Sequence, residues 1–211
     1  MTETGPGLID EQVALDGRVA RRQRNIDAVL DVVLTMFAED SLFPSMEQVA
    51  QRSGLSLRSL YRYFADPEAL HHAAVRHHRA RIEPIAHLPA IGQGPLERRI
   101  EAFVSMRLAV YEEAGPAYRA TLHNAGRNAR VRDQLARARD DLRAQFERQF
   151  APELRGLRSV ERDAVVAAGD VLTQLDSIEV LRRHRQLSVP EVEAALRVGL
   201  TALLGGSAGE P

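Results

Sequence analysis

Apolar residues recur at spacings of three and four positions along most of the chain, which is the period of an α-helix with one buried face. Between residues 18 and 40 the stripe consists of Ile26, Val29, Leu30, Val33 and Phe37. No alternating run of apolar and polar residues bounded by turn residues breaks this pattern. The sequence therefore predicts an all-α protein whose first helix covers residues 18–40.

Two short helices separated by a glycine turn are predicted next. Ser45, with a glutamine three residues later, has the spacing of a capping box and begins a helix over residues 46–52. Gly54 ends that helix, because glycine readily adopts the left-handed conformation. Ser56 can cap a third helix that continues to residue 64. This is the pattern of a DNA-binding helix-turn-helix.

The remaining chain predicts a second, larger helical domain. Prolines and glycines between residues 84 and 95 mark a linker, after which a helix begins at Leu96 and is expected to break at Pro116. Further helices are predicted over residues 128–150, 160–184 and 189–204. The expected organisation is a flexible acidic tail (1–17), a three-helix domain with the helix-turn-helix (18–81), the larger domain (82–206) and a C-terminal tail (207–211).

Charge supports this division only when it is counted by segment. The 211 residues carry a net charge of −1, with a sequence pI near 6.7, which alone argues against a nucleic-acid-binding protein. Residues 18–81, however, hold ten arginines against seven acidic residues, while residues 1–17 carry four acids and no arginine. All 28 basic residues are arginines. The helix-turn-helix segment is therefore the basic one.

Several classes of protein are disfavoured. The absence of cysteine excludes disulfides, thiolate metal sites and cysteine nucleophiles, and no apolar run reaches the roughly 20 residues of a membrane span. The phosphate-loop pattern G-x-x-x-x-G-K-[ST] does not occur, since the chain contains no lysine. The pairs His71-His72 and His77-His78 lack the i, i+4 spacing of a metal site and are expected on a solvated or interdomain face. We therefore expect a cytoplasmic protein that is not an enzyme, with no metal, cofactor or membrane partner.

The third predicted helix carries side chains suited to a DNA duplex. Arg58, in its first turn, can address guanine or a phosphate with two donors, and Ser59 is a short donor beside it. The hydroxyls of Tyr61 and Tyr63 can contact phosphates, as can Ser45 at the start of the preceding helix. Upstream, a basic arm that could follow the backbone or enter the minor groove contains Arg18, Arg21, Arg22 and Arg24.

Residues 45–70, SMEQVAQRSGLSLRSLYRYFADPEAL, resemble the signature of the tetracycline-repressor (TetR) family of bacterial transcription regulators, T-x-x-x-I-A-x-x-A-G-V-S-x-x-x-L-Y-x-Y-F-x-x-K-E-x-L. The resemblance implies a core role for Leu60 and Phe64. It departs at Pro67, where the family has a phosphate-binding lysine, and at Ser41, where it has a glycine. The N-terminal arginines are candidates to replace the lysine. The DNA contacts that the resemblance implies are Ser45, Leu57, Arg58, Ser59, Tyr61 and Tyr63.

The resemblance also implies a homodimer through the last two helices, bound to a pseudo-palindromic double-stranded operator, and a small-molecule inducer between the middle helices. For each pocket candidate, ordinary core packing is the alternative. Neither the ligand nor the operator sequence follows from the family. The candidates are Phe103, Met106, Tyr111, Tyr118, Leu122, His123, Phe146, Leu172, Gln174 and Leu175.

The function expected from these features is a transcriptional repressor that leaves its operator when an inducer binds. One alternative is an activator, or a DNA-binding regulator that senses no small molecule. A second alternative, from another class, is an all-α enzyme with an incidental helix-turn-helix. Footprint position relative to the promoter would separate repression from activation.

Overall fold

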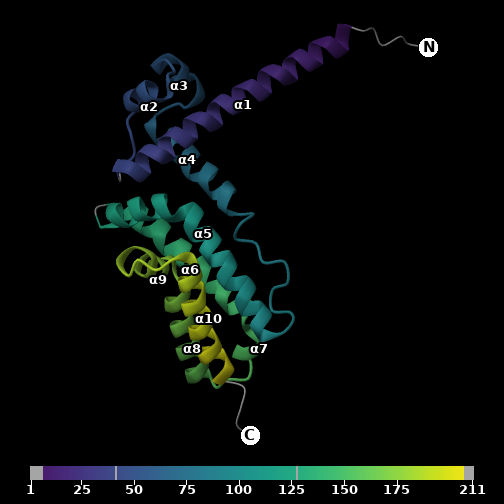
Figure 1. Ribbon diagram of the computed structural model, residues 1–211. Coiled ribbons are helices and arrows are strands. Elements are labelled where there is room, and N and C mark those ends of the chain that lie inside the picture. Colours follow the sequence, from purple (N-terminus) through teal and green to yellow (C-terminus); the bar gives the residue numbers. More distant parts are fainter. Residues whose placement is uncertain (1–6, 41, 127, 207–211) are drawn as a thin grey trace, which may run out of the picture. The chain divides into compact units, whose positions relative to one another are not determined.

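The computed structural model describes residues 7–40, 42–126 and 128–206. Within these ranges the chain forms helices joined by turns and loops, with no β-strand (Figure 1). The side chains of residues 7–16, Arg18 and Arg130 are outside this description. The chain divides into two compact units, Met1–Ala80 and Arg81–Pro211. The division lies one residue before the expected boundary. Within the described ranges no helix is long and apolar enough to cross a membrane.

The first unit is built from four helices, α1 (Gly7–Asp40), α2 (Met46–Ser53), α3 (Leu57–Tyr63) and α4 (Pro67–Ile82). They share a core to which every helix contributes, as the hydrophobic stripe of α1 predicts. Leu60 and Phe64 are buried in it, as expected. The buried members of this core are Val29, Leu30, Val33, Met36, Met46, Val49, Leu60, Phe64, Leu70 and Ala74.

The helix-turn-helix has the local geometry that the sequence predicts. Ser45 forms the capping box of α2: its Oγ accepts from the Gln48 N–H at 3.3 Å, and the Gln48 Oε1 accepts from the Ser45 N–H at 2.8 Å. Gly54 ends α2 with φ of 71°, the left-handed conformation that favours glycine. Ser56 then caps α3 by accepting from the Ser59 N–H at 3.2 Å. Turn and caps together fix where α3 begins.

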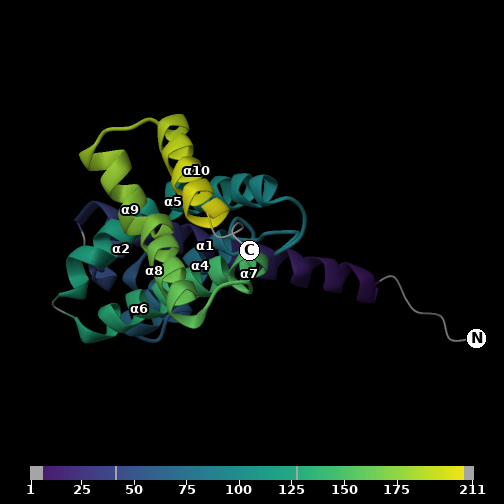
Figure 2. The ribbon, with the colours of Figure 1, turned by 90° about the horizontal axis from the view of Figure 1, so that it is seen from below.

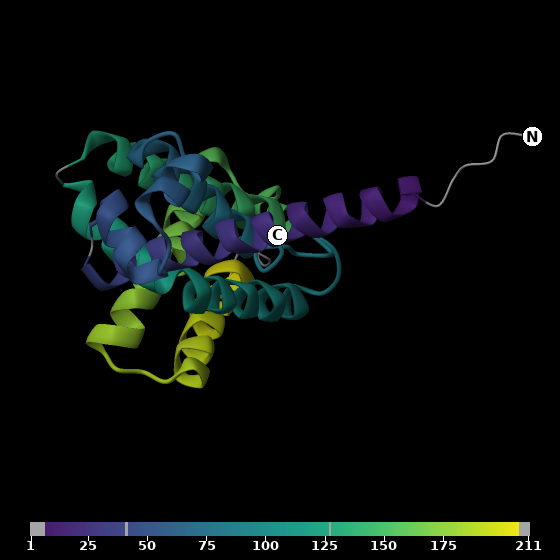
Figure 3. The same ribbon diagram turned by 90° about the horizontal axis from the view of Figure 1, so that it is seen from above.

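The first helix begins earlier than predicted. α1 starts at Gly7, so residues 7–17, expected in a flexible tail, are helical, and the N-terminal part of α1 extends beyond α2–α4 (Figures 1 and 3). Good helix formers in GLIDEQVAL and the acidic residues near the helix start explain the extension, because negative charge stabilises the N-terminal end of the helix dipole. Residues 1–6 and 207–211, assigned to the two tails, lie outside the described residues.

The second unit contains α5 (Leu96–Ala125), α6 (Ala129–Gln149), α7 (Ala151–Leu154), α8 (Ser159–Thr173), α9 (Leu175–Glu179), a π-helical turn (Val180–His184) and α10 (Val189–Gly205). α5 packs against α6 and α10, and α8 lies beside α10 (Figures 1 and 2). Ser188 and Glu191 form the predicted capping box of α10. Three aromatic rings fill the centre, with centroids 5.0–6.1 Å apart: Phe103, Phe146 and Phe150.

The prediction that Pro116 breaks its helix is wrong, because α5 continues through it to Ala125. Proline removes one backbone donor, and its ring crowds the Cβ of the residue before it. That residue is Gly115, which has no Cβ, so one of the two penalties is absent. The proline is also exposed, so water can reach the unpaired carbonyl group.

The predicted single helix over residues 160–184 is likewise interrupted. α8 ends at Thr173, because the next residue, Gln174, is extended with φ of −66° and ψ of 152°, and the chain then restarts as α9. Two carboxylates just beyond the break explain it: Asp176 and Glu179 are held by tyrosines of α5. These polar contacts with α5 stabilise the break more than a continuous helix would stabilise this segment. The spacing of apolar residues in the sequence gives no information about such contacts.

Candidate functional site

The exposed face of α3 presents an unpaired arginine and tyrosine. Arg58 is exposed and makes no hydrogen bond or ion pair with another described residue, and Tyr61 is 47% exposed and also unpaired. Leu57, in the first turn, is 37% exposed. A guanidinium, a phenol hydroxyl and an apolar side chain on one short helix can respectively bind guanine or phosphate, contact phosphate, and pack on a thymine methyl group.

The two serines that are predicted to contact DNA also take part in helix capping. The hydroxyl of Ser59 lies 2.9 Å from that of Ser56 and is half-buried, so it is turned toward the helix cap. Ser45 uses its oxygen as the cap acceptor and remains exposed, and its hydroxyl also hydrogen-bonds the Glu47 carboxylate. The backbone hydrogen bond of Glu47 itself, and then this bond from Ser45, lower the pKa of Glu47. Of the two, Ser45 is the better placed to contact a phosphate.

Tyr63 lies between two cations that belong to different helices. The guanidinium carbon of Arg22 in α1 is 5.8 Å from its ring centroid, and that of Arg62 is 5.4 Å away. Hydrogen bonding from Asn25 and then from Arg62 lowers the pKa of the Tyr63 hydroxyl below its usual value. The cluster joins the basic part of α1 to α3 and concentrates positive charge beside the half-buried Tyr63.

Arg62 is a candidate DNA contact that the sequence prediction omitted. Its spacing of four residues from Arg58 puts the two on one side of α3, and that spacing could have identified it.

The other upstream arginines are helical and exposed. Arg21, Arg22 and Arg24 belong to α1, in the part that the sequence predicts as helix, so the basic segment is helical where its side chains are described. Continuous helix geometry prevents this segment from following the minor groove as an extended chain would. Arg24 donates to the carbonyl of Ala20 at 3.4 Å. Arg18 lies in α1, but its side chain is outside the described residues.

The start of α4 is the place where the sequence departs from the family signature at Pro67. Asp66 caps the helix by accepting from the Ala69 N–H at 2.7 Å, and Pro67 is the first helical residue. The N-terminus of α4 is therefore well formed, with a neutral proline in place of the lysine of the family signature and a carboxylate one residue before it. Ser41, the other departure, lies outside the described residues.

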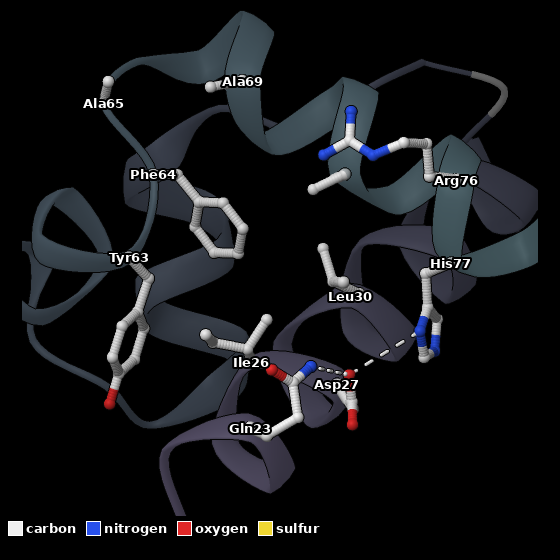
Figure 4. Close-up of a pocket in the computed structure, with 11 residues that line it drawn as sticks. Gln23, Ile26, Asp27, Leu30, Tyr63, Phe64, Ala65, Ala69, Arg76 and His77 are labelled. Carbon is white, nitrogen blue, oxygen red and sulfur yellow. Dashed lines mark hydrogen bonds and ion pairs between the residues drawn. The ribbon is translucent and has the colours of Figure 1, made fainter. Parts of the chain in front are cut away.

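A hollow of about 460 Å³ lies in the first unit between α1 and α4, beside the end of α3 (Figure 4). Its polar side holds His77, whose ring nitrogens lie 3.0 Å from Asp31 and 3.8 Å from Asp27. Gln23 donates to the same Asp27 at 2.9 Å. These contacts connect α4 to α1 and fix the angle between them.

The histidine pairs do not assemble into a metal site. His71 stacks on Phe43 with centroids 4.5 Å apart, and its Nε2 lies 3.1 Å from the Pro44 carbonyl. His72 lies 3.4 Å from Glu68. No group of three or more potential ligands gathers anywhere in the described ranges.

In the second unit, most of the predicted ligand-pocket residues lie in the core. Phe103, Phe146, Met106 and Leu175 are buried there, and Leu122 and Leu172 are half-buried against the same core. His123 is exposed near the end of α5 and does not join them. Neither the hollow described above nor a second one between α5 and α10 is lined by any of the ten predicted residues. The buried ones among the ten are packed into the core of the second unit.

A layer of tyrosine–carboxylate pairs borders this core. Tyr111 donates to Glu179 at 2.6 Å, and Tyr118 donates to Asp176 at 2.5 Å. Burial and then the hydrogen bond to Glu179 raise the pKa of Tyr111 to about 12, and the same two causes raise that of Tyr118 through Asp176. Arg139 completes the layer with two bonds to Asp176, at 2.7 and 3.1 Å. Both phenols therefore remain neutral donors at physiological pH.

The outer faces of α8 and α10 are apolar yet exposed. Val171 is 66% exposed and Val198 71% exposed, in helices that pack side by side. Exposed small side chains complete the strip on both helices. They are Ala164, Ala167 and Ala168 in α8 and Ala194, Ala195 and Ala202 in α10.

No protein-family model and no curated protein matches the sequence. Solved structures do match the fold. One from Rhodococcus sp., provisionally described as a TetR-family transcriptional regulator, is 18% identical, with a TM-score of 0.64 over 86% of this chain and 99% of its own.

Two other solved structures agree with this one. A transcriptional regulator from Rhodococcus sp. Rha1 is 17% identical, with a TM-score of 0.65 over 88% of this chain and 99% of its own. A TetR-family transcriptional regulator from Streptomyces coelicolor is 21% identical, with a TM-score of 0.65 over 90% of this chain and 82% of its own. The chain therefore has the fold of solved TetR-family transcriptional regulators.

Proposed function

We propose that the protein is a TetR-type transcriptional regulator that binds a pseudo-palindromic DNA operator as a homodimer and leaves it when a small molecule binds the second unit. The observation that carries this proposal is the helix-turn-helix with Arg58 and Tyr61 exposed and unpaired on α3. A free guanidinium on the second helix of such a motif is the group that reads guanine in a major groove.

Phosphate contacts would come from both sides of this helix. The cluster of Arg22, Arg62 and Tyr63 supplies two cations and a hydroxyl, and Ser45 supplies a hydroxyl at the start of α2. Such contacts hold the recognition helix in register without reading sequence. The cations of α1 and α3 would compensate for the missing lysine at Pro67.

Dimerisation would bury the strip on α8 and α10. Exposed valines on adjacent helices, flanked by alanines, let two such pairs pack closely as a four-helix bundle. A two-fold axis through this bundle relates two recognition helices, so each half-site of a pseudo-palindrome meets one α3.

Release by a ligand requires different affinity for two conformations of the protein. The closed aromatic core and the tyrosine–carboxylate layer lie between α5, α6 and the break that follows α8. A ligand that enters there would move α8, which also carries the dimer strip, and so would alter the spacing of the recognition helices.

The test is a titration that measures the affinity of the protein for two DNAs. One is the DNA upstream of its own gene, and the other is random DNA. Arg58→Ala should weaken specific binding by about 1–3 kcal/mol and leave random-DNA binding nearly unchanged. The matched control is Arg132→Ala, an exposed arginine on α6 of the second unit. Equal loss on both DNAs would reduce Arg58 to a phosphate contact, and absence of any specific complex would refute the proposed function.

A further inference from the structure

Arg107 of α5 is fully buried and charged, yet it has no carboxylate partner. Its Nη1 donates to Gln145 Oε1 at 2.5 Å and its Nη2 to the Leu142 carbonyl at 2.6 Å. Its Nε has no hydrogen-bond partner among the described residues. Burial lowers the pKa of Arg107 to about 9, with the nearby Asp170 acting in the opposite direction. At neutral pH the guanidinium therefore remains a cation bound only by neutral oxygens.

A second buried arginine of the same helix, by contrast, has a carboxylate partner. Arg99 makes two bonds to the Glu153 carboxylate, one of them at 2.7 Å, and a third to the Gln149 carbonyl at 2.9 Å. Removing an ion from water without a counterion costs several kcal/mol, so buried arginines are normally paired in this way. Arg107 departs from that rule beside Phe103, one of the predicted pocket residues.

The surroundings of Arg107 provide an acceptor and apolar walls. Its guanidinium lies 4.5 Å from the centroid of Phe103, which packs on Phe146. Across the same core, Gln174 donates to Asp170 at 2.5 Å and to the Arg139 carbonyl at 3.2 Å, while its Oε1 is buried without a partner. A buried unpaired donor, a buried unpaired acceptor and aromatic walls thus occur around Asp170.

We infer that Arg107 binds the carboxylate of a small organic acid, whose apolar body lies among the rings and whose own hydrogen-bond donor meets Gln174 Oε1. This inference rests on the proposed function, because it names the chemical class of the effector. A cation with a free N–H favours an anion, and an orphan carbonyl oxygen favours a hydroxyl or amide donor. A hydroxylated aromatic or aliphatic acid has both groups.

Because Arg107 lies in a packed core, binding of such a ligand would be coupled to a change in conformation. Phe146 is fully buried, packs on Phe103 and lies against Gly169 of α8, so an acid that binds among these rings would shift that contact. The energy of the new ion pair compensates for the lost packing. Binding and movement of α8 are therefore linked, as a ligand-driven change of state requires.

The experiment measures melting temperature and calorimetric affinity of the full-length protein with two hydroxylated acids, 4-hydroxybenzoate and 4-hydroxyphenylacetate, at millimolar concentration. The corresponding neutral amides are the matched controls. The acids should raise the melting temperature and the amides should not. In Arg107→Met the affinity for the acids should fall about tenfold to a hundredfold, as expected for loss of a charged hydrogen bond.

Two further variants keep this test decisive. Arg143→Met removes an exposed arginine of α6 and should leave acid binding unchanged. Arg107→Lys keeps the charge but not the planar guanidinium, and should bind the acids more weakly even if Arg107→Met does not fold. With no ligand, Arg107→Met should melt at the same temperature as the unmodified protein or higher, because an uncompensated buried charge is removed.

Three results would overturn the inference: equal response to acids and amides, acid binding that survives in Arg107→Met, or no response of the unmodified protein to either acid. The proposed function is judged separately by ligand-free DNA binding. A protein that binds its operator but no acid refutes only the inference. One that binds acids but no specific DNA refutes only the proposed function.

Discussion

Gly169 of α8 is the position where a single methyl group should have the largest effect on packing. A Cβ built there overlaps Cζ of Phe146 and lies 2.5 and 2.7 Å from the two ε carbons of the ring. The ring cannot give way freely, because Phe146 is fully buried among Phe103 and Phe150. Gly169→Ala therefore forces either the ring or α8 to move.

The size of the effect follows from two opposing contributions. Overpacking of a dense core costs about 3 kcal/mol at the upper end, and three ring atoms inside 3 Å place this site there. Alanine is better than glycine inside a helix by about 1 kcal/mol. The net expectation is a loss of about 2 kcal/mol in the free energy of unfolding, or a urea midpoint lower by about 1 M.

The assay is urea denaturation of the full chain at one fixed protomer concentration, since dimerisation would make stability concentration-dependent. Gly199→Ala is the graded control: its Cβ meets Leu172 Cδ2 at 2.8 Å, the tip of a flexible side chain, and we expect a change within about 0.5 kcal/mol. Gly169→Ala combined with Phe146→Leu should lose less than the sum of the two single changes, by about 1 kcal/mol. A Gly169→Ala protein as stable as the unmodified one would refute the reasoning.

Three other changes test separate parts of the molecule. Ser45→Ala removes the capping box of α2 and should destabilise the first unit by about 1 kcal/mol, seen as faster hydrogen exchange in α2; unchanged exchange would contradict this. Val171→Glu should convert a dimer into folded monomers in sedimentation, while Leu42→Glu, equally exposed in the first unit, should not. Arg62→Ala should weaken operator and random DNA alike and reduce the salt dependence of binding, and a loss confined to the operator would instead assign it to a base.

Local signals in the sequence predict local structure well in this chain. The caps at Ser45 and Ser188 and the turn at Gly54 depend on residues within three or four positions, and each is found as expected. The exposed face of α3, the proposed DNA-binding surface, could be predicted for the same reason, because exposed residues on a short helix follow from its caps. Arg62, the further candidate, was left out only because its spacing from Arg58 was not used.

The second unit was harder to predict because its decisive contacts join residues far apart in the chain. The break after α8 follows from bonds between Tyr118 and Asp176 and between Tyr111 and Glu179, which span some 60 to 70 positions. The unusual character of Arg107 appears only when the absence of a counterion is seen in three dimensions. Apolar periodicity predicts that these helices have a buried face, but not which polar groups share it.

One side of α8 is exposed and the other is buried in the core, and this limits which insertions, deletions and substitutions the helix can tolerate. Ala167, Ala168 and Val171 face outward, whereas Gly169 and Thr173 are buried among the other helices. Deleting one codon would rotate every later residue by about 100° around the helix axis, and so turn buried positions toward solvent and exposed positions toward the core. Natural variants should therefore keep the length of α8 fixed, tolerate substitutions there only within each side, and accept insertions in the loops before α5 and before α10.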